Sequence, residues 1–149
     1  MTNAIVIDDD PIIAKMISEF LELKKIHVLG IGYNGKDAVA LYQKFNPDVV
    51  FLDAQMPNYD GFYGFKELKK LNPNVTVIML TNDITSDLED KFEELGISAV
   101  IYKSLDMKHF IEKVENVLKK WWHKMSKEME ELNKLTIETM QKVKQHLGK

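Results

Sequence analysis

The sequence predicts an α/β protein: a doubly wound, five-stranded parallel sheet followed by an extended C-terminal helix. First, short apolar runs alternate with stretches of helical periodicity in five successive units. Second, each apolar run is continuous, which is typical of parallel strands that helices cover on both faces. Third, neither proline nor glycine interrupts residues 105–147, so the last helix is expected to continue beyond the fifth unit. Right-handed crossovers between parallel strands give the doubly wound arrangement.

The five strands are expected where apolar residues run together. Ala4-Ile5-Val6-Ile7 is rich in β-branched residues, and the third run, residues 48–53, is apolar on both faces and ends in a carboxylate. Three further runs of the same kind complete the sheet. The expected strands are residues 4–7, 27–31, 48–53, 75–80 and 98–102.

Residues that start and stop helices set the boundaries of the five helical stretches. Asp10 and Pro11 predict an N-cap and a first helical position directly after the first strand. The Asn-Pro pairs at residues 46–47 and 72–73 end the second and third helices, because the residue before proline disfavours helix. Gly96 closes the fourth helix. The expected helices are residues 11–24, 34–45, 62–71 and 83–95, with a fifth from about residue 106.

Composition and charge exclude several function classes. The chain has 149 residues, 45% of them hydrophobic, and no cysteine, which excludes disulfides, thiolate zinc sites and cysteine nucleophiles. All 20 basic residues are lysine, and the last 31 residues carry 8 of them against 4 glutamates, whereas the rest of the chain is acidic. We therefore expect a cytoplasmic protein without a membrane span or secretory signal, and no nucleic-acid binding.

Charged and hydroxyl side chains gather at the carboxyl ends of the strands, where doubly wound sheets form their sites. Asp8, Asp9 and Asp10 follow the first strand; Asp53, Thr81 and Lys103 end or follow the third, fourth and fifth. Each alone is more often a helix cap, a loop residue or a surface charge, but their joint placement indicates a site. Clustered carboxylates suit Mg²⁺, with Mn²⁺ a further candidate, and a metal beside a lysine and a hydroxyl suits phosphoryl transfer.

The sequence resembles the receiver domains of two-component response regulators, in particular the single-domain chemotaxis type. The motifs are Val6-Ile7-Asp8-Asp9-Asp10-Pro11, Leu52-Asp53-Ala54-Gln55-Met56-Pro57 with Asp60-Gly61, Leu80-Thr81, and Tyr102-Lys103. The resemblance implies a flavodoxin-like strand order of 2-1-3-4-5, a receiver domain over residues 1–118 and a helical extension over residues 119–149.

The resemblance also implies a role for each site residue. Asp53 is the expected phosphoacceptor, taking its phosphoryl group from a histidine kinase or phosphotransfer protein, with Thr81 and Lys103 contacting that group. Asp8, Asp9, Asp53 and the backbone carbonyl of Gln55 are the expected Mg²⁺ ligands, and Asp10 is a second-rank candidate. The chain would then be a phosphoacceptor with self-catalysed phosphorylation and dephosphorylation rather than a turnover enzyme, and its downstream partner is an unknown protein.

Two positions depart from the family pattern. Ser104 stands where the family has proline on a cis peptide bond, so this bond is expected to be either trans or strained. Val100 stands at the family's aromatic switch position, and Tyr102 is expected on the opposite face of the strand. The coupling of Thr81 to a rotating aromatic ring is therefore expected to differ here.

The C-terminal helix carries an apolar stripe. Leu118, Trp122, Met125, Met129 and Leu132 follow a 4,3,4,3 spacing that residues 135–147 extend less cleanly, with Thr136 and Thr139 expected to weaken the distal part. A repeat of 3.5 residues favours a two-stranded coiled coil or a helical hairpin. We expect a homodimer through residues 116–147, with packing back onto the fourth and fifth helices as the alternative.

Two other functions remain open. A phosphatase resembling the haloacid-dehalogenase-like family would use Asp8 as nucleophile and Asp10 as acid, but it needs a further strand with an acidic pair beyond Lys103 and gives no role to the residues around Asp53. A pseudo-receiver would keep the fold as an interaction scaffold without phosphorylation.

Overall fold

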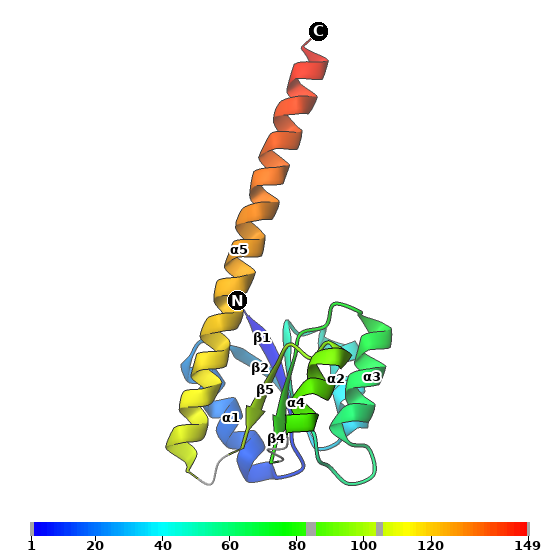
Figure 1. Cartoon of the computed structure of the whole chain (residues 1–149), viewed down its shortest axis with the longest axis vertical. Coiled ribbons are helices and arrows are strands. Elements are labelled where there is room, and N and C mark those ends of the chain that lie inside the picture. The colour runs from blue at the N-terminus through cyan, green and yellow to red at the C-terminus, as the bar shows by residue number, and fades with distance from the viewer. Residues whose placement is uncertain (1, 83–85, 104–105, 149) are drawn as a thin grey trace. The chain divides into compact units, whose positions relative to one another are not determined.

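The computed structural model describes residues 2–82, 86–103 and 106–148. Five parallel strands form one sheet of order β2-β1-β3-β4-β5, which confirms the predicted fold and strand order (Figure 1). The strands are β1 (Asn3–Ile7), β2 (His27–Gly32), β3 (Val49–Asp53), β4 (Val77–Thr81) and β5 (Ala99–Tyr102). The helices are α1 (Pro11–Leu23), α2 (Gly35–Phe45), α3 (Gly61–Leu71), α4 (Ser86–Leu95) and α5 (Met107–Leu147).

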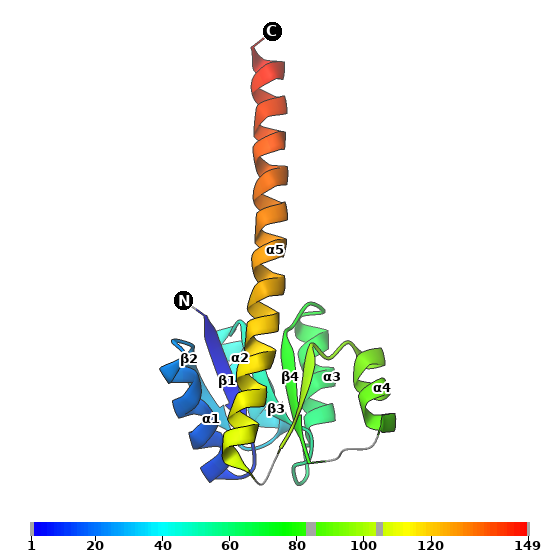
Figure 2. The ribbon, with the colours of Figure 1, turned by 60° about the vertical axis from the view of Figure 1, so that its left-hand side comes forward.

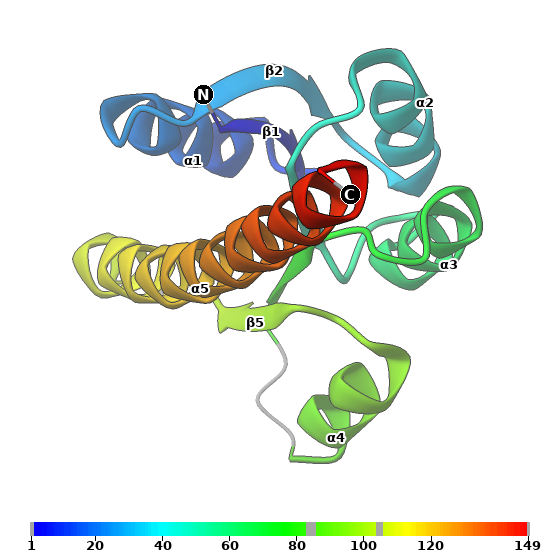
Figure 3. The ribbon, with the colours of Figure 1, turned by 90° about the horizontal axis from the view of Figure 1, so that it is seen from above.

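Helices cover both faces of the sheet. α2, α3 and α4 lie on one face, and α1 lies on the other with the first turn of α5 (Figures 2 and 3). The central strands β3 and β4 are consequently buried at every residue, which explains why they read as continuous apolar runs. The edge strands β2 and β5 are half-buried over most of their length.

The sequence signals for helix boundaries act as predicted. The carboxylate of Asp10 accepts a hydrogen bond from the backbone N–H of Ile12 at 2.9 Å, so it caps α1. Asn46 has φ 46° and Gly96 has φ 80°, the left-handed conformation that ends helices α2 and α4. β4 begins at residue 77 rather than 75, because the N–H of Val75 bonds the carbonyl of Asn72 in a turn.

One expectation about β5 is wrong. Val100 and Tyr102 are two residues apart in a regular strand, and side chains two apart share a face of the sheet. Their partial burial on either side of the buried Ile101 agrees with this alternation. Val100 packs against the cluster that includes Phe92 of α4, so Tyr102 is an aromatic residue on the α4 side of the sheet.

The chain divides into two compact units, residues 1–111 and residues 112–149. The first contains the sheet, α1–α4 and the first turn of α5, and the second is the rest of that 41-residue helix. The boundary at residue 118 drawn from the sequence stays a prediction. Within the described ranges, no helix has the length and apolar content needed to cross a lipid bilayer.

Candidate functional site

The carboxyl edge of the sheet brings together side chains from four strands. Asp8 directly follows β1, Asp53 and Thr81 end β3 and β4, and Lys103 directly follows β5. The parallel register sets their alignment: Asp53 lies beside Leu80, and the N–H of Lys103 donates to the carbonyl of Thr81 at 2.7 Å. The joint placement predicted from the sequence is therefore present.

Lys103 joins two carboxylates across the sheet. Its Nζ lies 2.7 Å from Oδ2 of Asp8 and 3.1 Å from Oδ2 of Asp53. The side chains of Lys103, Asp8 and Asp53 are 9%, 0% and 2% exposed, so the three charges sit in a region of low water access. Thr81 is fully buried beside them in the sheet. One ammonium faces two carboxylates, which leaves an excess negative charge.

The carboxylates of Asp8, Asp9 and Asp53 form a group that could hold a cation. One oxygen from each lies within 4.8 Å of the others, with Asp9 on the exposed side. Oδ2 of Asp8 is buried, and the partner that the structure gives it is the ammonium of Lys103, 2.7 Å away. Three carboxylates beside one ammonium carry an uncompensated negative charge, which fits a hard divalent cation with oxygen ligands.

Burial shapes the protonation of Asp53. Desolvation, followed by the charge of Asp8, raises the pKa of Asp53 from 3.8 to about 7, although Lys103 and the N–H of Gln55 act in the opposite direction. Burial also acts to lower the pKa of Lys103, but its hydrogen bonds and charge interactions with Asp8 and Asp53 outweigh this, and that pKa is raised. Lys103 is therefore cationic at neutral pH, while Asp53 titrates close to neutrality.

Asp10 and Gln55 hold the site through backbone atoms. The N–H of Asp10 donates to Oδ1 of Asp8 at 2.9 Å, and the N–H of Gln55 donates to Oδ1 of Asp53 at 3.2 Å. Each bond fixes a carboxylate two residues upstream. The side chain of Asp10 is occupied as the α1 cap and lies outside the group of three carboxylates. The peptide bond between Lys103 and Ser104 lies outside the described residues.

Gly61 has a role at the site that the sequence did not reveal. A Cβ added there would lie 2.2 Å from the carbonyl oxygen of Asp53 and 2.8 Å from the Cα of Ala54, closer than real Cβ atoms approach. The N–H of Gly61 donates to the carbonyl of Ala54 at 3.2 Å, and Asp60 caps α3 by accepting from the N–H of Tyr63. The Asp60-Gly61 pair therefore docks the start of α3 against the end of β3, and only the missing Cβ permits it.

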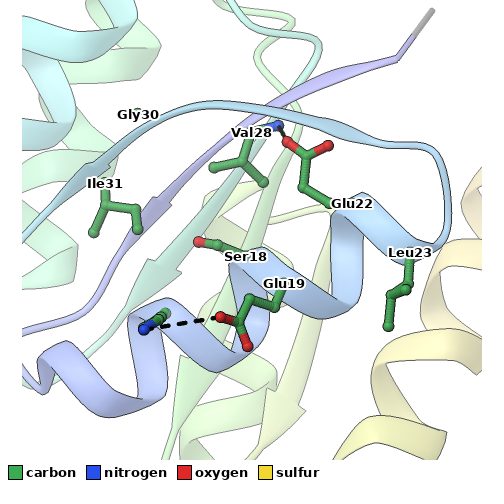
Figure 4. Close-up of a pocket in the computed structure, with 8 residues that line it drawn as sticks. Ser18, Glu19, Glu22, Leu23, Val28, Gly30 and Ile31 are labelled. Carbon is green, nitrogen blue, oxygen red and sulfur yellow. Dashed lines mark hydrogen bonds and ion pairs between the residues drawn. The ribbon is translucent and has the colours of Figure 1, made fainter.

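A separate surface pocket lies between α1 and β2 (Figure 4). Its lining comes from one face of α1, including Ser18 and Glu22, and from the edge strand, including Val28 and Ile31. It contains none of the acidic residues at the strand ends, so it is distinct from the candidate site.

The haloacid-dehalogenase-like alternative gains no support from the described residues. That reading needs a strand with an acidic pair after Lys103, but residues 107–147 form a single helix in the described part of the chain. The residues around Asp53, which that reading leaves without a role, lie at the centre of the carboxylate group.

Comparisons with known proteins agree with the fold. Residues 4–115 match the response regulator receiver domain family. The chain is 34% identical over 128 residues to protein-glutamate methylesterase/protein-glutamine glutaminase 2 of Methanosarcina mazei, covering 85% of this chain and 32% of that relative. It is 29% identical over 119 residues to chemotaxis protein CheY of Treponema pallidum, covering 78% and 83% of the two chains.

A solved structure extends the likeness to three dimensions. The receiver domain of the Francisella response regulator 1452 is similar with a TM-score of 0.68 at 28% identity, covering 80% of this chain and 98% of that chain. The present chain spans about a third of the length of the methylesterase relatives that it matches. Because the family match includes most of the chain, this chain belongs to the response regulator receiver domain family.

Proposed function

We propose that Asp53 accepts a phosphoryl group from a phosphohistidine on a histidine kinase or phosphotransfer protein. The observation that carries the proposal is the position of Asp53, buried at the end of β3, where the ammonium of Lys103 contacts its carboxylate and that of Asp8. A carboxylate oxygen of Asp53 attacks phosphorus, the P–N bond breaks, and its electron pair returns to the imidazole nitrogen.

The neighbours of Asp53 have distinct tasks in this proposal. The ammonium of Lys103 pairs with the phosphoryl oxygens, and the hydroxyl of Thr81 donates a hydrogen bond to them. The carboxylates of Asp8, Asp9 and Asp53, with the backbone carbonyl of Gln55, would hold Mg²⁺ or Mn²⁺. When bound, the cation neutralises the clustered negative charge and polarises the phosphoryl group.

In this proposal the protein acts as a signalling switch and not as a turnover enzyme. The aspartyl phosphate replaces a carboxylate whose partners are Lys103 and the backbone of Gln55. A larger and more negative group at that position competes for the same donors, which changes the end of β5. We propose that a downstream protein binds the surface altered in this way.

The test measures the intact mass of the full chain after incubation with a small phosphodonor and Mg²⁺. We expect a gain of one phosphoryl group that chelation and Asp53→Asn each abolish, and that Asp90→Asn, the same change at an exposed carboxylate on α4, leaves intact. Label that persists in Asp53→Asn, or that maps to Asp8, contradicts the proposal. A chain that takes no label from either a phosphodonor or a phosphorylated kinase would be a pseudo-receiver scaffold.

A further inference from the structure

The second unit of the chain, residues 112–149, presents an apolar stripe to solvent. Its members lie along one face of α5, three or four residues apart except between Leu132 and Met140, and are 38% to 80% exposed. They are Met125, Met129, Leu132, Met140, Val143 and Leu147. A helix with an exposed apolar face gains stability when a partner covers that face.

Two threonines on the same stripe are compatible with a buried interface. The hydroxyl of Thr136 donates to the carbonyl of Leu132, and that of Thr139 donates to the carbonyl of Leu135, both at 2.8 Å. Each hydroxyl is therefore satisfied within its own helix and does not require water. Their methyl groups remain available to pack, so the stripe continues from Met125 to Leu147.

Side-chain size favours an antiparallel partner. If a second copy runs antiparallel with its residue 139 opposite Met129, then Thr136 lies opposite Leu132 and Val143 lies opposite Met125. Every small side chain then faces a large one, which fills the core. In a parallel pair each threonine would face its own counterpart, giving two successive thin layers.

Charge favours the same register. Glu128 and Lys142 lie on one flank of the stripe, both are exposed, and neither has an ion pair among the described residues. In the antiparallel register they meet across the interface, twice by symmetry, on either side of Leu135. A parallel pair would instead place Asn133 of the second copy beside Glu128 and leave both charges unpaired.

The segment over which the two copies pair lies within the second unit. In this register Leu147 of one copy lies opposite Trp121 of the other, so residues 121–147 pair over roughly 40 Å at 1.5 Å per residue. The paired segment begins after residue 112, where the second unit begins, and ends before Gly148. The apolar stripe, the charges and the length of the unit thus agree on one register.

We propose that residues 121–147 bind a second copy of this chain as an antiparallel two-stranded coiled coil in which Met129 lies opposite Thr139. The proposal is independent of phosphorylation, because every residue that carries it lies in the second unit. The pairing places the two receiver domains at opposite ends of the coiled coil.

Charge reversal tests the register on the full-length chain. Glu128→Lys or Lys142→Glu alone turns two attractions into two repulsions. We expect the dissociation constant of the dimer to rise about tenfold at low salt. The double variant restores both pairs in antiparallel register and should return the dissociation constant to the wild-type value. Glu131→Lys, the same charge change away from the stripe, is the control. Sedimentation equilibrium measures all four.

Cross-linking tests the direction of the partner. Because the chain has no cysteine, single cysteines report one contact each. Met129→Cys mixed with Thr139→Cys should form the mixed disulfide, while Met129→Cys alone should not link to itself. Self-linkage of Met129→Cys would show a parallel pair, and a wild-type chain that is monomeric at tens of micromolar would overturn the dimer itself.

Discussion

Replacing Asp53 with asparagine should stabilise the protein, and more so as pH rises. Asp53→Asn keeps the size of the side chain but removes a charge that is 2% exposed and faces Asp8. In the folded protein the pKa of this carboxyl is about 7, whereas an ordinary aspartate in water has a pKa of 3.8. The folded state therefore binds the proton more tightly than the unfolded state. Wild-type stability therefore falls as pH rises from about 4 to about 7, and stays low above that range.

The magnitude follows from the two pKa values. A difference of about 3 between them corresponds to at most about 4 kcal/mol of destabilisation when Asp53 is fully charged. Between about pH 5.5 and about pH 8.5 the penalty should grow by about 2 kcal/mol, because part of it is already present at the lower pH. Asp53→Asn has no such proton to lose, so its advantage over wild type should widen by that amount.

Urea unfolding without divalent cations, at a fixed protein concentration and both pH values, measures this difference. Asp90→Asn, an exposed carboxylate on α4, is the control and should stay within about 0.5 kcal/mol of wild type at each pH. Added Mg²⁺ should stabilise wild type more than Asp53→Asn, because a ligand stabilises the state that binds it. An advantage of Asp53→Asn that is the same at both pH values would refute the description of Asp53 as a buried, destabilised charge.

Four further substitutions separate the roles around the site. Asp9→Asn should weaken Mg²⁺ binding strongly by calorimetry. Asp10→Ala should mainly cost α1 its cap, about 1 kcal/mol by urea unfolding, because alanine cannot accept the capping hydrogen bond. Equal losses of Mg²⁺ affinity would reverse the assignment. Lys103→Met should lower the yield of aspartyl phosphate on intact mass while the fold persists by circular dichroism, and an unchanged yield would remove Lys103 from the mechanism. Gly61→Ala should lower both the melting temperature and the phosphorylation of Asp53, because the new Cβ would collide with the carbonyl oxygen of Asp53. An unchanged melting temperature and an unchanged yield of aspartyl phosphate would mean that the loop relaxes freely.

The sequence predicted the strands and their ends well because those features are local. A continuous apolar run, an Asp-Pro start and a glycine or asparagine stop each act within a few residues, so β1 to β5 and the caps of α1 and α2 could be expected from the printed sequence. The collection of Asp8, Asp53, Thr81 and Lys103 at one edge followed from a parallel sheet.

Long-range detail was less accessible. That Gly61 must lack a Cβ depends on how closely α3 approaches the end of β3, which no local pattern records. The raised pKa of Asp53 depends on burial and on the distance to Asp8. The face of the sheet on which Tyr102 lies was predicted wrongly, although it is a local feature. Residues two apart in a strand share a face, so Tyr102 lies on the same face as Val100.

Lys103 links the edge of the sheet to its centre. β5 is a four-residue edge strand whose ladder partner is β4, and the ion pairs of Lys103 reach past β4 to the ends of β1 and β3. The two ion pairs of Lys103 therefore connect the outermost strand, β5, to carboxylates at the ends of two inner strands. Any chemistry that alters those carboxylates changes the ion pairs of Lys103. We therefore expect the position of β5, which pairs with β4 alone, to change before that of the inner strands.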